Sequence, residues 1–138
     1  MKKIKNKLKI GIIISQFNRE VVDGLLKSAE KALQKNALLK GTDIVRVPGA
    51  FEIPYAAARM AASKKYDGLI ALGCVIKGET DHYEAICRGV SYGVQKVSIE
   101  SGVPIMFGVL MCKNEKLARA RLNKGGECVN GLIELLQK

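Results

Sequence analysis

The chain has 138 residues, of which 48% are hydrophobic and 26% charged, a composition typical of one folded globular domain and not of a disordered chain. Lysine and arginine outnumber aspartate and glutamate by 23 to 13, and the net charge of +10 favours an anionic partner, either nucleic acid, a membrane surface or a metabolite. Four cysteines without a C-x-x-C pair, and an N-terminal apolar run too short for a signal peptide or a membrane span, argue against a secreted or membrane protein, so we expect a reduced, cytoplasmic protein with a single domain over residues 1–138.

Two strand–helix pairs are predicted in the first half of the chain. Short apolar runs rich in isoleucine and valine predict the strands, and apolar residues spaced three and four apart predict the first helix. Asn18 is the candidate N-cap of that helix, and Pro54 falls near the start of the second helix, where proline is tolerated. The predicted elements are a strand over residues 8–14, a helix over 19–35, a strand over 43–47 and a helix over 54–63.

Two further strands and three helical segments are predicted in the second half. The longest apolar run forms the third strand, and Asp81-x-x-Glu84 is a possible capping box for the helix after it. Gly102 can end that helix, and Pro104 prevents its continuation. The predicted elements are a strand over residues 68–76, a helix between 81 and 102, a strand over 105–110, and helices over 114–122 and 127–137.

Four strands that alternate with helices predict an α/β fold with three layers, αβα, and a four-stranded, mainly parallel sheet of flavodoxin-like order 2-1-3-4. Such a sheet binds its ligand beyond the carboxyl ends of the strands, where the winding reverses direction, here between the first and third strands. The loops over residues 15–18 and 77–81 should therefore form the ligand crevice.

The second of these loops, with Glu79 and Thr80, should open the third helix, so that its free backbone N–H groups face the crevice and bind an anion such as phosphate. Simple helix capping is the alternative. His82, the only histidine, is the best candidate for a general acid or base because its ordinary pKa lies near neutrality, although a surface histidine in the first turn of a helix fits the pattern too.

Other side chains near the crevice leave alternatives open. Phe17 either covers the end of the sheet or stacks on a planar ring, and Glu52 either accepts hydrogen bonds from hydroxyl groups or stabilises a helix start. Apolar neighbours favour a neutral, buried thiol for Cys74 over a nucleophile. The sequence shows no cluster of cysteine, histidine and carboxylate residues at metal-ligand spacing, so we expect no metal site.

Several of these segments, spread over nearly the whole chain, resemble the 6,7-dimethyl-8-ribityllumazine synthase family of riboflavin biosynthesis. They are Phe17-Asn18 after the first strand, V-P-G-A-F-E-I-P at 47–54, Y-D-G-L-I-A-L-G at 66–73, V-I-K-G-E-T-D-H-Y at 75–83 and G-V-P-I-M-F-G-V-L at 102–110. The resemblance implies a transferase that condenses 5-amino-6-(D-ribitylamino)uracil with 3,4-dihydroxy-2-butanone 4-phosphate and releases phosphate and water. It implies no cofactor.

By matching position, the resemblance implies a role for each of twelve residues. His82 would donate and accept protons, Phe17 would stack on the uracil ring, and Glu79 and Thr80 would bind phosphate. The ribityl side of the pyrimidine would be held by Ala50, Phe51 and Glu52, with backbone contacts from Cys74, Val75 and Ile76, and the site would be completed from a neighbouring subunit by Phe107 and Arg121.

The resemblance further implies a homo-oligomer, either a pentamer or a pentamer-based icosahedral shell with active sites between subunits. The link from Arg121 to Lys124 is shorter than is common in the family, and Arg119 is the fallback phosphate ligand. A non-catalytic pteridine- or flavin-binding protein with the same pocket is the main alternative. The lysines at positions 2, 3, 5, 7 and 9 have no aromatic residues between them, which favours a solvated basic face over a nucleic-acid partner, although a basic nucleic-acid binder is a third interpretation. Since the apolar run is too short for a membrane span, we expect no membrane partner either.

Overall fold

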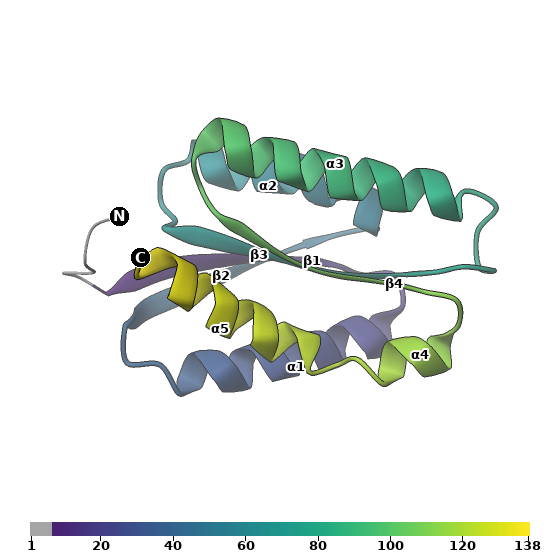
Figure 1. The fold of residues 1–138 in the computed structure, drawn as a ribbon, viewed down its shortest axis with the longest axis horizontal. Helices are drawn as coiled ribbons and strands as arrows, with labels where there is room; N and C mark the ends of the chain where they lie inside the picture. Colours follow the sequence, from purple (N-terminus) through teal and green to yellow (C-terminus); the bar gives the residue numbers. More distant parts are fainter. Residues whose placement is uncertain (1–6) are drawn as a thin grey trace.

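The computed structural model describes residues 7–138 and contains a four-stranded sheet between two layers of helices (Figure 1). Positions 2, 3 and 5 of the lysine-rich start lie outside the described residues. The sheet has the order β2-β1-β3-β4 and all its neighbouring strands are parallel, which confirms the predicted α/β architecture and strand order. The strands are β1 (Leu8–Ser15), β2 (Leu39–Val47), β3 (Gly68–Ile76) and β4 (Ile105–Cys112).

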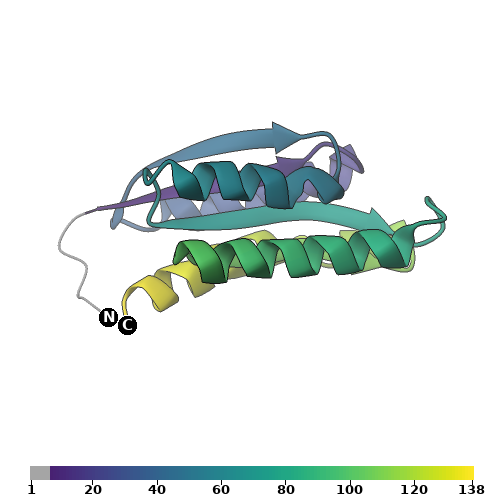
Figure 2. The same ribbon diagram turned by 90° about the horizontal axis from the view of Figure 1, so that it is seen from above.

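Helices cover both faces of the sheet, as two views at right angles show (Figures 1 and 2). The helices are α1 (Arg19–Gln34), α2 (Ile53–Ala62), α3 (Tyr83–Ser101), α4 (Glu115–Arg119) and α5 (Lys124–Leu136), and a 3-10 turn, η1 (Ala50–Glu52), precedes α2. Helices α2 and α3 lie on one face, and α1, α4 and α5 lie on the other (Figure 1). No helix within residues 7–138 is long and apolar enough to cross a membrane.

The core consists of two apolar clusters, one on each face of the sheet. Ile12 and Ile70 belong to the cluster under α1 and α5, whereas Ile13 and Leu69 belong to the cluster under α2 and α3. Every residue of β3 is buried, because this strand is central and both of its faces are covered. Each fully buried isoleucine or leucine contributes about 1.5–3 kcal/mol relative to an exposed one, so these strands hold the carboxyl edge of the sheet rigidly.

The predicted strands and helices are all present, with differences at their ends. Strand β3 has the predicted bounds, and α1 and α2 match within one residue. Strand β2 begins at Leu39 and not at Asp43. The earlier start was not predicted because β2 is an edge strand, and its residues 40–42 are exposed or only partly buried and form no apolar run. Strand β4 continues to Cys112, and α5 begins at Lys124, three residues before the predicted start.

The start of α3 corrects the predicted capping box. The helix begins at Tyr83 with His82 as its N-cap, and it has no side-chain cap hydrogen bond. The hydroxyl oxygen of Thr80 instead accepts a hydrogen bond from the backbone N–H of His82, at 3.1 Å, and so closes a turn before the helix. At the other end of α3, Gly102 is left-handed with φ of 76° and ends the helix as predicted.

A polar network joins β1, β2 and the start of β3 at the amino edge of the sheet. The Tyr66 hydroxyl donates a hydrogen bond to Asp43 Oδ2 at 2.7 Å, and Lys9 Nζ donates to Asp43 Oδ1 at 3.1 Å. The hydrogen bond from Tyr66, supported by Lys9, lowers the pKa of the Asp43 carboxyl below its ordinary value.

Candidate active site

A pocket of about 380 Å³ opens at the carboxyl edge of the sheet between β1 and β3. This is the place predicted from the strand order, where the chain leaves β1 toward one face and β3 toward the other. The predicted site residues that the structure brings together in its walls are Phe17, Ala50, Phe51, Glu52, Cys74, Val75, Ile76, Glu79 and Thr80.

Two exposed phenylalanines stand at the walls of this pocket. Phe17 is 60% exposed and Phe51 is 59% exposed, so both rings present open faces beside the pocket. A Cβ atom on Gly89 of α3 would lie 2.8 Å from the ring of Phe51, so this ring packs directly on a bare stretch of helix backbone. Open aromatic faces of this kind suit the stacking of a planar ring.

The turn over residues 49–52 shapes the second wall. Glu52 Oε1 accepts a hydrogen bond from the backbone N–H of Gly49 at 2.9 Å, and the backbone N–H of Glu52 donates to the Gly49 carbonyl at 3.2 Å. The carboxylate therefore stabilises the start of η1, as one of the two interpretations of the sequence held. Only one of its oxygens is used in this way, so the other remains able to accept a hydrogen bond from a ligand.

The end of β3 forms the floor of the pocket. Cys74, Val75 and Ile76 are all buried, with 2%, 6% and 6% exposure. Burial, together with the neighbouring Cys112, raises the pKa of the Cys74 thiol to about 12. The thiol is therefore neutral at physiological pH, in agreement with the prediction of a structural cysteine over a nucleophile.

Asn18 also lines the pocket, as expected for the loop over residues 15–18, although it was not among the predicted substrate contacts. It occupies the N-cap position of α1 as predicted, but its side chain makes no cap hydrogen bond. Its amide nitrogen Nδ2 instead donates to the backbone carbonyl of Cys74 at 2.9 Å. The residue thus connects the loop after β1 with the end of β3, a contact that no local sequence pattern indicates.

His82 lies in a second hollow of about 430 Å³, next to the first pocket. Thr80 lines both hollows, whereas His82 is exposed and lines only the second. Two cations and two carboxylates also line this hollow, namely Lys77, Arg88, Asp81 and Glu84. Neither cation was predicted as a ligand contact, although Lys77 begins the loop that was expected to form the crevice, and Arg88 lies in the second turn of α3. The cations can contact an anion, and the carboxylates offset their charge.

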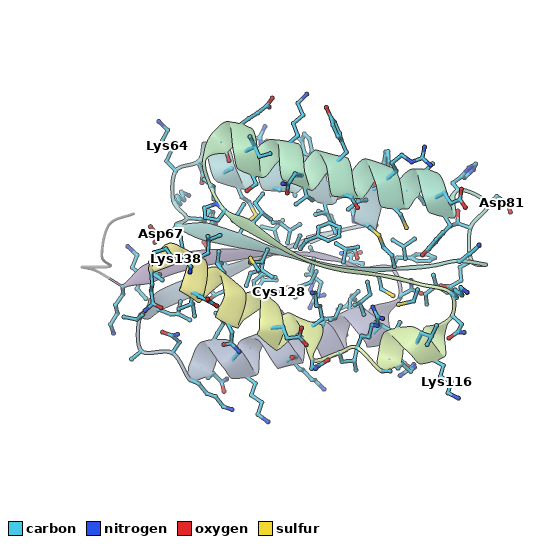
Figure 3. All side chains as sticks on the ribbon, in the orientation of Figure 1. Lys64, Asp67, Asp81, Lys116, Cys128 and Lys138 are labelled. Carbon is cyan, nitrogen blue, oxygen red and sulfur yellow. The ribbon has the colours of Figure 1, made fainter. Side chains whose placement is uncertain are left out.

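The helix start that was predicted to bind phosphate lies elsewhere than expected. Because α3 begins at Tyr83, Glu79 and Thr80 belong to the preceding loop and not to the first turn of the helix. Figure 3 labels Asp81, the residue before His82, at the tip of this loop on the α3 side of the molecule, and Lys116 on α4 on the opposite side.

Phe107 and Arg121 do not reach the crevice of their own chain. Phe107 pairs with Ala71 in the middle of β3 and packs half-buried against the cluster under α2 and α3. Arg121 is exposed in the link between α4 and α5, in the other helix layer. Neither residue lines the pocket at the carboxyl edge.

Arg119, the fallback phosphate ligand, is held by two carboxylates. Its guanidinium forms ion pairs with Glu20 of α1 and with Glu115 one turn earlier in α4, the latter at 2.8 Å. These hydrogen bonds raise the pKa of Arg119 above its ordinary value. A phosphate group would have to displace two carboxylates from Arg119, so Arg121 is the better candidate of the two.

Within residues 7–138, no three His, Cys, Asp or Glu side chains are grouped so that they could hold a metal ion. The side chains that line the two hollows offer aromatic faces, carboxylates, a hydroxyl group, cations and one imidazole.

Comparison with known proteins finds one family that matches nearly the whole chain. The family model described as 6,7-dimethyl-8-ribityllumazine synthase matches residues 7–138. A protein of that name from Pediococcus pentosaceus is 45% identical over 137 residues, and the match covers 95% of this chain and 88% of the relative. The residues matched by the family model include all those that line the two hollows.

Proposed function

Because the chain belongs to the 6,7-dimethyl-8-ribityllumazine synthase family, we propose that its crevice carries out the reaction of that family with the residues that line it. The protein is a transferase that condenses 5-amino-6-(D-ribitylamino)uracil with 3,4-dihydroxy-2-butanone 4-phosphate to give 6,7-dimethyl-8-ribityllumazine, phosphate and water. The observation that carries the assignment of the site is the gathering of Phe17, residues 50–52, residues 74–76 and Thr80 around one pocket at the predicted edge of the sheet.

The pyrimidine substrate occupies the pocket between β1 and β3. Its planar ring stacks on Phe17, and its ribityl chain extends toward Ala50, Phe51 and Glu52, where the free carboxylate oxygen accepts hydrogen bonds from hydroxyl groups. The floor at the end of β3 contributes backbone contacts, since the Cys74 thiol is buried and neutral. A pocket of about 380 Å³ has the size usual for a small organic ligand.

The butanone phosphate occupies the second hollow with its phosphate near Thr80 and the loop before α3. The Thr80 hydroxyl oxygen accepts from the backbone of its own loop, and its hydrogen remains free to donate to a phosphate oxygen. Lys77 and Arg88 supply positive charge around this position, which Asp81 and Glu84 partly offset. Arg121 adds a guanidinium group from a neighbouring subunit, and its bidentate geometry suits a phosphate.

His82 moves the protons of the reaction. The amine of the pyrimidine attacks the ketone and forms an imine with loss of water, and phosphate is then eliminated to leave an enol. The enol tautomerises to a ketone, and the ribitylamino nitrogen attacks this carbonyl and expels a second water as the ring closes. Each of these steps transfers protons at neutral pH, and an imidazole beside the phosphate hollow can both give and accept them. His82 contributes most to the elimination of phosphate, because the imidazole and the leaving phosphate lie in the same hollow.

The active protein is a homo-oligomer, a pentamer or a pentamer-based shell, with each site completed by the next subunit. The positions of Phe107 and Arg121 away from the crevice of their own chain support this arrangement. Mixed oligomers test it: His82→Ala and Arg121→Ala chains are each impaired alone, and co-assembly restores sites that contain both native side chains. If both residues served the same subunit, no mixture would recover activity. Mass photometry of the native protein distinguishes a pentamer from a shell.

The protein works as one domain in the cytoplasm. The family model spans nearly the whole chain, and all four cysteines are free thiols, as a reducing compartment requires. Expression of the protein with a fluorescent fusion in its own host, followed by cell fractionation, tests this location.

The reaction itself is tested by incubation of the protein with the two substrates. We expect lumazine absorbance to rise in parallel with phosphate release, one phosphate for each lumazine. Tight binding of the lumazine without turnover would mean that the chain is a binding protein with the same pocket.

A further inference from the structure

Asn18 has a left-handed backbone conformation, which is uncommon for residues other than glycine. Its φ is 60° and its ψ is 52°. Among the described residues other than glycine, only Lys64 also has a positive φ. Glycine adopts this conformation without strain, and asparagine is the side chain that tolerates it best after glycine. The backbone conformation thus accounts for an asparagine here, and since its amide does not cap α1, the contact that the amide makes instead is informative.

The use of the amide is a bond across the crevice. Nδ2 of Asn18 donates to the carbonyl of Cys74 at 2.9 Å, over a sequence separation of 56 residues. The residue is half-buried, so this hydrogen bond is partly shielded from competition with water. It is the one side-chain hydrogen bond within the described residues that joins the loop after β1 to β3.

The neighbouring residues show what this bond holds in place. The backbone N–H groups of Gln16 and Phe17 donate to the carbonyls of Val47 and Pro48, at 2.8 and 3.2 Å, and so fix the loop to the end of β2. Asn18 fixes the same loop to the end of β3. Phe17 stands between these two attachments, and because 60% of its surface is exposed, packing does little to hold its ring.

We propose that Asn18 is a positioning residue, which sets the face of Phe17 at a fixed distance from the floor of the pocket and so determines the affinity for the planar ring of the pyrimidine substrate. This inference rests on the proposed function of the crevice. The amide needs no direct contact with the substrate in this role, since it acts through Phe17 and the Cys74 carbonyl. The butanone phosphate binds in the other hollow, so its KM, measured at saturating pyrimidine, does not depend on Asn18.

Two substitutions separate the parts of this proposal. Asn18→Gly keeps the left-handed backbone and removes the amide, and Asn18→Asp keeps the shape but turns an acceptor toward the Cys74 carbonyl. Asn36→Asp is the matched control: it adds the same charge, and the Asn36 side chain already serves as an acceptor, from the Leu38 N–H at 2.9 Å, at the opposite end of the molecule.

We expect Asn18→Gly to raise the KM for the pyrimidine about three- to tenfold, the scale of one hydrogen bond, with the KM for the butanone phosphate unchanged. Asn18→Asp should raise it further, and Asn36→Asp should leave both values as in the native protein. A purely structural role for Asn18 would lower Tm and the active fraction but move neither KM, and that result would overturn the proposal. An equal rise in both KM values would overturn it as well.

The same experiment keeps this proposal apart from the proposed function. If the native protein forms no lumazine from the two substrates, the function is wrong. Calorimetric titration with the pyrimidine alone then still compares Asn18→Gly with the native protein, and equal dissociation constants would refute the positioning role.

Discussion

Gly125→Ala should separate α5 from α1 and weaken both the fold and the phosphate site. A Cβ atom at Gly125 would lie 2.0 Å from the carbonyl oxygen of Leu25 and 3.0 Å from the backbone nitrogen of Ala29. Ordinary contact begins at 3.4 Å, so the helices must move apart by about 1.4 Å at this point, and the obstacle is backbone that cannot rotate away. Because α1 and α5 form the largest helix–helix contact, many side chains lose packing together.

The expected loss follows from the cost of overpacking, about 1–3 kcal/mol, with little gained in return from helix propensity because Gly125 lies in the first turn of α5. We expect a free energy of unfolding lower by about 2–3 kcal/mol and a Tm lower by roughly 10 °C. Arg121 lies four residues before Gly125 in the link between α4 and α5, so the KM for the butanone phosphate should also rise, more than that for the pyrimidine.

Gly131→Ala in the same helix is the control. A Cβ atom there would lie 2.7 Å from Cε of Met106, the flexible end of a side chain that can turn aside. In the middle of a helix, alanine gains about 1 kcal/mol over glycine, so this variant should be near neutral. Urea unfolding at a fixed protein concentration measures both variants. Equal stability of Gly125→Ala and Gly131→Ala would refute the argument from close helix contact.

Three further predictions concern the site and the amino edge of the sheet. His82→Ala should slow turnover about tenfold to a thousandfold, the usual range of acid–base catalysis or just below it, while calorimetry finds lumazine affinity largely unchanged; an unchanged rate would remove the histidine from the mechanism. Arg121→Ala should raise the KM for the butanone phosphate more than that for the pyrimidine, whereas the same steady-state result from Arg119→Ala would move the phosphate to Arg119. The pKa of Asp43 is lowered in the folded state by its hydrogen bond from Tyr66, so its contribution to stability is present above the pKa of the unfolded chain, about 3.9, and is lost as pH falls through the folded value. Thermal unfolding of the native protein and of Asp43→Asn should therefore differ at pH 7 and converge below about pH 4, and a constant difference over that range would contradict the linkage.

The fold could be predicted from the sequence where burial determines the pattern. Strand β3 is buried on both faces, so its apolar run is unbroken and its bounds were predicted to the residue. The first residues of β2 were not predicted because an edge strand needs no run of apolar side chains. Lys40, Gly41 and Thr42 do not form such a run. Local polar chemistry was less certain: Asp81 and Glu84 have the spacing of a capping box, but the turn closed by Thr80 places the helix start later.

The position of the candidate site could be predicted from the sequence for the part that one chain supplies. Strand order alone located the crevice and placed Phe17 beside Thr80, because the carboxyl ends of parallel strands share one edge. The bond from Asn18 to the Cys74 carbonyl was not predictable, since it joins residues 56 positions apart and competes with an ordinary cap. Phe107 and Arg121 were assigned by resemblance alone, and their positions show that one chain does not bring them to the crevice.

Thr80 belongs to the walls of both hollows, so in the proposed assignment the two substrates contact the same residue. A molecule in one hollow forms part of the surface that the other presents to the second molecule. The coupling free energy between two bound ligands is the same whichever arrives first, so any gain in affinity that the pyrimidine gives to the phosphate-bearing partner is returned in equal measure. The order of addition is then a matter of rates, and the ternary complex has one stability by either route.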